Sequence, residues 1–141
     1  MTDNETRELF HLLNQRVRMI TKEMNTVLSD HGLYHSQWSI IFCLNQFGPM
    51  TQTAVWKYLN VEAPTVTRTL SRMEKNGWTI RKHGADKRER LIELTEAAKE
   101  KFTAVNKAVA QAEKEMAQLL SSEEIQQLQH LLRKLATTEG E

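Results

Sequence analysis

The chain has 141 residues, of which 40% are hydrophobic and 26% charged, a composition typical of one soluble globular domain. Its acidic, polar N-terminus does not resemble a signal peptide, and no apolar run approaches the roughly 20 residues that span a bilayer. The single cysteine excludes an intramolecular disulfide framework and fits a reducing compartment. We therefore expect a cytoplasmic protein without a membrane partner.

The net charge of +1 hides a local concentration of cations. Residues 57–90 hold nine lysines and arginines against four acidic residues, a net charge of +5, whereas the remainder holds ten against fourteen, a net charge of −4. A polyanion would therefore meet one attractive region on a mildly acidic body. On charge alone, a solvated basic face without any partner explains the distribution equally well.

Two helices are predicted in the N-terminal third. Apolar residues recur every three or four positions over residues 5–30, which indicates one long helix that Gly32 ends. Ser36 is the predicted N-cap of a second helix that ends before Gly48. Its apolar run at 38–44 predicts a central, buried position. The apolar stripe of the first helix consists of Leu9, Leu13, Val17, Ile20, Met24 and Val27.

A short helix, a tight turn at Asn60 and an amphipathic helix over 63–76 follow, which is the pattern of a helix-turn-helix. Thr51 is the predicted cap of the short helix, whose inward residues are Ala54, Val55, Tyr58 and Leu59. The next helix is predicted to bury Val66, Leu70 and Met73. Its candidates for the major groove are Thr65, Thr67, Arg68, Ser71 and Arg72, because arginine can bind guanine bidentately and threonine methyls can contact thymine. Taken alone, this segment is better explained as an ordinary amphipathic surface helix.

Two alternating segments, 78–82 and 90–94, predict a β-hairpin directly after this helix, and hence a winged helix. A wing lies along the phosphate backbone and can insert an arginine into the minor groove. The candidate DNA-binding residues of the wing are Lys82, Lys87, Arg88 and Arg90. Alternation places Arg90 on the face of Ile92 and Leu94, so we expect a structural role for Arg90, paired with Asp86, and a groove-reading role for Arg88.

Two further amphipathic helices are predicted in the C-terminal third, separated by a capping-box pattern at 121–124. Their apolar seams consist of Phe102, Val105, Val109, Ala112, Met116 and Leu119 in the first and Ile125, Leu128, Leu132 and Leu135 in the second. Such seven-residue seams favour helix-on-helix packing, either between two subunits or within one bundle.

Residues 59–100 resemble the MarR (multiple antibiotic resistance regulator) family of bacterial transcription factors. The family's Asp-x-Arg wing signature is matched by Asp86-Lys87-Arg88, and its Glu-x-x-Gly helix end by residues 74–77, with Arg81 after it. The threonine-rich recognition helix is matched by residues 65–68, and the order of elements agrees across nearly the whole chain. Glu62, at the expected N-cap of that helix, departs from the family's usual serine-like residue.

The resemblance implies a mainly α fold with a small β-hairpin wing, in which residues 1–141 form a single chain of the MarR type. The winged helix-turn-helix region would be 36–94, and the helical dimerisation region 5–31 with 96–137. Asp86 would position the wing, and the terminal helices would intertwine in a homodimer. A small-molecule effector is implied between the dimerisation helices and the winged helix, and its candidate cleft residues are His11, Arg16, Trp38 and Phe42.

No phosphate-binding glycine loop, metal site, cofactor site or catalytic constellation is recognisable, so we expect no enzyme. Cys43 is expected to pack in the core rather than to sense oxidants. Core packing explains Trp38 and Phe42 as well as an effector cleft does. The leading expectation is a homodimeric regulator, a repressor relieved by a small ligand, that binds double-stranded DNA at a pseudo-palindromic operator. The alternative is a winged-helix protein–protein interaction module whose basic face meets an acidic partner.

Overall fold

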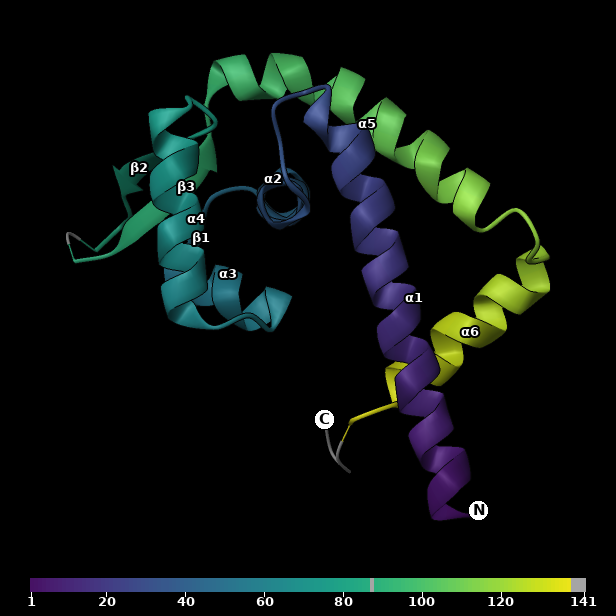
Figure 1. Ribbon diagram of the computed structural model, residues 1–141. Helices are drawn as coiled ribbons and strands as arrows, with labels where there is room; N and C mark the ends of the chain where they lie inside the picture. The colour runs from purple at the N-terminus through teal and green to yellow at the C-terminus, as the bar shows by residue number, and fades with distance from the viewer. Residues whose placement is uncertain (87, 138–141) are drawn as a thin grey trace.

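The computed structural model describes residues 1–86 and 88–137 and confirms a mainly helical winged-helix fold with a small antiparallel sheet (Figure 1). In chain order the elements are α1 (Asp3–Ser29), α2 (His35–Phe47), β1 (Met50–Thr51), α3 (Gln52–Leu59), α4 (Ala63–Lys75), β2 (Thr79–His83), β3 (Arg90–Leu94), α5 (Glu96–Met116) and α6 (Ser122–Lys134). Within these described residues, no helix combines the length and the apolar character needed to cross a membrane. Lys87, one of the wing candidates, lies outside the described residues.

Side-chain caps set where most helices begin. Thr2 and Ser121 each form a capping box with the glutamate three residues later, and the box at Ser121 confirms the prediction. Thr51 accepts the backbone N–H of Ala54, as expected of the cap of α3. The prediction for Ser36 is wrong, because the N-cap of α2 is Tyr34, two residues earlier, and the helix begins at His35.

The start of α2 is held instead by Gln37 and Asn25. The Gln37 side chain accepts the backbone N–H of Tyr34, the residue that caps the helix, over 3.0 Å. Asn25, which lies on α1, accepts the N–H of His35 over 2.7 Å. The second contact joins residues ten positions apart and ties the beginning of α2 to α1.

The sheet has the order β1-β3-β2, with all neighbours antiparallel. The β2–β3 hairpin runs from the pair Thr79–Leu94 to the pair His83–Arg90, close to the predicted strands. The two-residue strand β1 was not predicted, since so short a segment cannot show an alternating pattern. β1 pairs with β3 through Met50 and Thr51, and therefore anchors the start of α3 on the wing sheet.

The hydrophobic core surrounds α2, whose side chains at six positions are buried. Trp38 is buried there and stacks on Phe102 of α5, with 5.6 Å between ring centroids. α4 turns Val66, Leu70 and Met73 into this core, as predicted. Tyr58 was expected to point inward but is 51% exposed.

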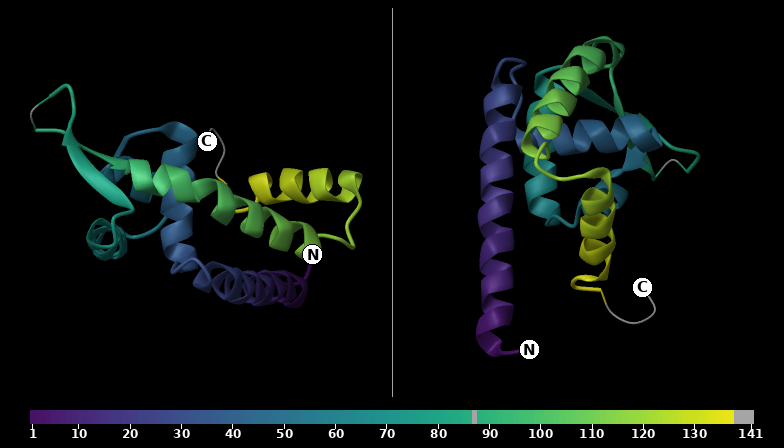
Figure 2. Two further views of the ribbon diagram at one scale, coloured as in Figure 1. Left: turned by 90° about the horizontal axis from the view of Figure 1, so that it is seen from above. Right: turned by 90° about the vertical axis from the view of Figure 1, so that its right-hand side faces the viewer.

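The N-terminal half of α1 and the whole of α6 extend beyond this body (Figures 1 and 2). Every residue of α6 is exposed except the half-buried Ile125. Of the predicted apolar stripe of α1, only Met24 is buried. The predicted seam of the next long helix extends too far, because α5 ends at Met116 and Leu119, which lies beyond it, is 93% exposed. The exposed apolar side chains of these arms include Leu9, Phe10, Leu12, Val17, Met19, Ile20, Leu128, Leu131 and Leu132. Exposed apolar side chains in this number indicate sites of protein association.

A single threonine connects the winged helix to α5. The Thr95 hydroxyl donates to the carbonyl oxygen of Gly77, just after α4, over 2.6 Å. The same hydroxyl oxygen accepts the N–H of Ala98 and so caps α5, while the Thr95 N–H donates to the carbonyl oxygen of Trp78. The first turn of α5 is thereby fixed to the turn that ends α4.

Candidate nucleic-acid interface

The exposed face of α4 carries hydroxyls and cations. Four of the five predicted major-groove residues, Thr67, Arg68, Ser71 and Arg72, are exposed there, opposite the buried stripe of the helix. Thr65 is half-buried instead. Together with Thr69 it lines a hollow of about 280 Å³ between α2 and α4.

The hydroxyls of α4 bond back to their own helix. Thr67, Thr69 and Ser71 each donate to the carbonyl oxygen four residues earlier, over 2.9–3.0 Å. Back-bonding of this kind orients a hydroxyl side chain along the helix. Glu62 is the N-cap residue of α4, but its side chain makes no hydrogen bond to the backbone N–H groups of the first turn.

The wing turn is organised by Asp86. Its carboxylate accepts the backbone N–H of Arg88 over 3.0 Å, and its carbonyl oxygen accepts the N–H of Glu89 over 2.9 Å. Glu89 in turn accepts the N–H of Gly84 through its carbonyl oxygen. The expected pairing of Asp86 with Arg90 is therefore replaced by a backbone contact, which presents the exposed Arg88 side chain at the wing tip.

Two ion pairs hold the wing in place, and neither was predicted. Arg81 on β2 donates to the carboxylate of Glu74 on α4 over 2.5 Å, with each side chain about one third exposed. Lys82 on β2 pairs with Glu93 on β3. The hydrogen bond and the charge of Glu93 raise the pKa of the Lys82 ammonium above its ordinary value. The only signal in the sequence for the Glu74–Arg81 pair is that the two residues lie seven positions apart, with Gly77 between them.

Basic side chains converge near the wing tip. Arg81, Lys82, His83 and Arg90 line a hollow of about 150 Å³. Arg90 is exposed at the outer end of β3, opposite His83, although its alternation partners Ile92 and Leu94 are buried. α4 packs against β2 (Figure 1), so the cations of the helix and of the wing belong to one region of the molecule.

The four candidate effector residues do not share a cavity among those found in the described residues. Trp38 is buried, Phe42 is 45% exposed with its ring centroid 6.3 Å from that of Trp38, and His11 is exposed on α1. Arg16 lines a hollow of about 630 Å³ where α1, α5 and α6 meet. The sequence alone could not distinguish these positions, because all four fit helical faces equally well.

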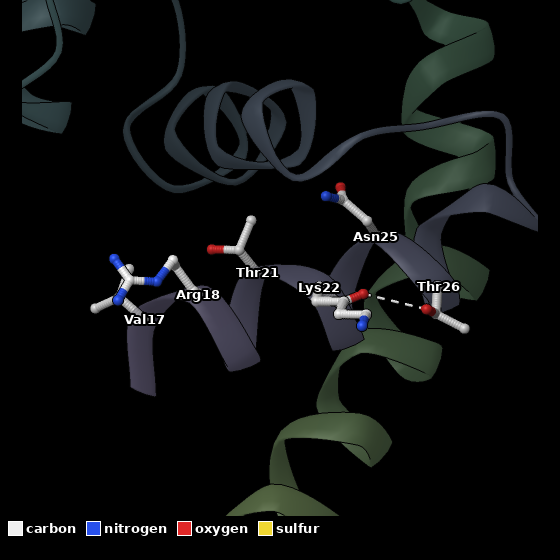
Figure 3. A pocket seen from close by; sticks show the side chains of 6 residues that line it. All are labelled: Val17, Arg18, Thr21, Lys22, Asn25 and Thr26. Atoms are coloured by element: carbon white, nitrogen blue, oxygen red, sulfur yellow. Dashed lines mark hydrogen bonds between the residues drawn. The ribbon is translucent and has the colours of Figure 1, made fainter. Parts of the chain in front are cut away.

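A different groove of about 550 Å³ runs along α1 (Figure 3). It is lined by Val17, Arg18, Thr21, Lys22, Asn25 and Thr26, and in Figure 3 Thr21 and Asn25 point toward α2. The Thr26 hydroxyl donates to the carbonyl oxygen of Lys22 over 3.1 Å. Sequence analysis missed this groove, since all of its residues except Val17 are polar and fit the solvated side of a helix equally well.

Cys43 is buried, and its thiol donates to the sulfur of Met50 over 3.2 Å. Burial raises the pKa of this thiol above its ordinary value, which keeps it protonated at neutral pH. Within the described ranges, no group of three or more histidine, cysteine or acidic side chains is placed to hold a metal ion.

Comparisons with known proteins agree with this geometry. The sequence profile of the MarR family matches residues 33–89. The HTH-type transcriptional regulator YwoH of Bacillus subtilis is 47% identical over 127 residues, which cover 90% of this chain and 93% of that protein.

Solved structures share the whole fold. A mutant of MarR from E. coli, crystallised with operator DNA, superposes with a TM-score of 0.86 at 25% identity over 95% of this chain and 97% of that one. The apo form of wild-type E. coli MarR gives a TM-score of 0.73 at 26% identity, over 92% of this chain and 96% of that one. With the exposed cations of α4 and the hairpin beside it, these matches establish that the chain belongs to the MarR family of transcriptional regulators.

Proposed function

We propose that this chain, a homodimeric DNA-binding regulator, recognises a pseudo-palindromic operator with α4 in the major groove and the wing along the backbone and minor groove. The observation that carries the proposal is the placement of Thr67, Arg68, Ser71 and Arg72 on one exposed face of α4, next to a basic wing. Arginine reads guanine in the major groove and can enter a narrow minor groove. The solved E. coli relative bound to operator DNA supports this assignment.

The exposed apolar surfaces of the arms support the division of the chain into two regions. We assign DNA binding to residues 36–94 and dimerisation to residues 5–31 and 96–137. In a two-fold symmetric dimer, two recognition helices that enter successive major grooves lie roughly 34 Å apart. The operator would accordingly be a pseudo-palindrome with half-sites about ten base pairs apart.

Repression is the proposed direction of regulation in the cytoplasm, because a dimer seated on an operator that overlaps a promoter blocks access to it. A small anionic ligand is the proposed effector, with Arg18 and Lys22 of the α1 groove as its counter-charges. We prefer this groove to a cleft lined by His11, Arg16, Trp38 and Phe42, because of these four only Trp38 and Phe42 form a contact, with 6.3 Å between their ring centroids. A promoter–reporter fusion with and without the chain measures the direction of regulation.

The test of the proposed function is selection from randomised duplex DNA at about physiological salt, followed by sequencing of the retained DNA. We expect a two-fold symmetric motif for the unaltered protein and its loss in the double variant Arg68→Ala, Arg72→Ala. The matched control is Lys107→Ala, Lys114→Ala, which removes the same charge from the exposed side of α5.

The salt dependence of binding separates the two double variants further. The α4 variant should reduce the log–log salt slope by about 0.9 for each phosphate that the protein no longer neutralises, whereas the α5 control should leave the slope unchanged. DNA that is retained without a motif and released at modest salt would contradict the proposal and leave only a basic surface.

A further inference from the structure

The first residue of α3 contacts the exposed face of the recognition helix. The side-chain nitrogen Nε2 of Gln52 donates to the hydroxyl oxygen of Thr67 over 2.5 Å, and the Thr67 hydroxyl donates to the carbonyl oxygen of Ala63 over 3.0 Å. We propose that Gln52 is a positioning residue that, through Thr67, makes the regulator select an A·T pair at one position of each half-site. This inference rests on the proposed binding of α4 in the major groove.

Gln52 is itself held firmly. The Thr51 hydroxyl caps α3 by accepting the N–H of Ala54 over 3.1 Å, which fixes the backbone on both sides of Gln52. Thr51 also pairs with Leu91 in the sheet. The backbone next to Gln52 is therefore held on β3 through Thr51, and the Gln52 side chain reaches α4 from the first turn of a helix rather than from a loop.

The bond from Gln52 limits what the Thr67 hydroxyl can offer to DNA. A hydroxyl has one donor and two acceptor lone pairs. Its donor is directed to Ala63, and one lone pair accepts from Gln52. The exposed side chain of Thr67 thus presents one lone pair and its γ-methyl group, and no donor.

Gln52 also selects the rotamer of Thr67. In helices threonine divides between two χ1 rotamers, because its hydroxyl can bond the carbonyl either three or four residues earlier. The bond from Gln52 is compatible with the observed rotamer, in which Thr67 contacts Ala63, four residues earlier. Without Gln52, the methyl group and the lone pair would exchange places between two orientations.

A side chain without a donor discriminates among base pairs. In the major groove guanine shows two acceptors, O6 and N7, that such a hydroxyl cannot satisfy. The lone pair can accept from the N6 amino group of adenine or from the N4 amino group of cytosine, so it is the contact of the γ-methyl with the C5 methyl of thymine that favours A·T over G·C. Neighbouring arginines supply the donors that guanine needs, so Thr67 and Arg68 read different base pairs.

The experiment determines the base preference at every operator position for the unaltered dimer and three variants, by sequencing selected DNA and by competition binding. We expect Gln52→Ala to lower the preference for A·T about five- to tenfold at one pair per half-site and to leave the other positions unchanged. Thr67→Ser keeps the hydroxyl but loses the methyl, and should lose the same preference. Thr67→Val keeps the methyl, and should retain it.

Thermal unfolding of each variant separates positioning from stability, because a loss of stability does not alter preference at a single base pair. A Gln52→Ala profile identical to that of the unaltered protein would overturn the inference, as would a guanine preference at the position that the Thr67 variants change. If the unaltered protein selects no motif, the proposed function fails. If it selects a motif that Gln52→Ala leaves intact, only the role of Gln52 fails.

Discussion

The ion pair between Glu74 and Arg81 allows the positioning of the wing to be tested against simple electrostatics. Glu74→Gln removes a negative charge from the DNA-binding side of the molecule, and charge alone predicts tighter binding to DNA. The pair, however, joins the end of α4 to β2, and its removal frees the wing from the helix. We expect Glu74→Gln to weaken binding to the operator.

The magnitude follows from the exposure of the pair. The Arg81 and Glu74 side chains are 33% and 32% exposed, so solvent screens their attraction and a coupling free energy of about 0.5–1 kcal/mol is expected. Without the ion pair, binding to DNA must supply this free energy to order the wing. The loss corresponds to a two- to fivefold rise in Kd, because roughly 1.4 kcal/mol changes Kd tenfold. The midpoint of thermal unfolding should fall by about 2–4 °C.

Fluorescence anisotropy with a labelled operator at about 0.15 M salt measures Kd, and a double-mutant cycle with Arg81→Gln measures the coupling. The matched control is Glu89→Gln, which removes the same charge from the wing turn, where the backbone of Glu89 makes the hydrogen bonds. The control should bind DNA slightly more tightly. Binding by Glu74→Gln that equals or exceeds that of the control would refute the reasoning.

Three further predictions concern the wing, the arms and the buried thiol. Asp86→Ala removes the acceptor of the Arg88 N–H and should raise the operator Kd about three- to tenfold with little change in stability, whereas Asp86→Asn, which keeps an oxygen there, should bind nearly normally in the same anisotropy assay. An equal loss in both variants would contradict this reasoning, because it would show that an acceptor oxygen at position 86 is not what holds the turn. Leu128→Glu places a charge on the apolar face of α6 and should shift the dimer toward monomer in sedimentation velocity, and Gln127→Glu, its exposed neighbour, should not. Unchanged sedimentation of Leu128→Glu would exclude α6 from the interface. The Cys43 thiol, buried and with a raised pKa, should react with an aromatic disulfide at least about 100-fold more slowly in the native protein than in urea at pH 7. Comparable rates in both conditions would show that the thiol is accessible.

The helices and the wing could be predicted because their signals are local. The apolar spacing that predicts α4, the threonine cap of α3 and the capping box before α6 each depend on residues within a few positions of one another. Ser36 failed as a cap because a distant residue, Asn25 of α1, binds the start of α2 and shifts its first turn. Local pattern and tertiary structure competed there, and the tertiary hydrogen bond prevailed.

The parts of the site that could not be predicted are contacts through space. Gln52 and Thr67 lie 15 residues apart, and their approach depends on the angle between α3 and α4, which no spacing in the sequence encodes. The inward expectation for Tyr58 failed for a similar reason. The Tyr58 ring packs edge-on against Phe47 at the surface, with 4.8 Å between ring centroids. Tyr58 therefore has an apolar contact although it is not buried in the core.

The hydrogen bonds of Thr95, which connect the winged helix to α5, have a consequence for the spacing of the half-sites within an operator. Because one side chain bonds both the end of α4 and the first turn of α5, the winged helix cannot swivel about that junction without breaking these bonds. A change in the angle of α5 must therefore move α4, the proposed recognition helix, together with it. We therefore expect the long helices of the arms to set the number of base pairs between half-sites, so that mutations there change operator spacing without altering the exposed residues of α4.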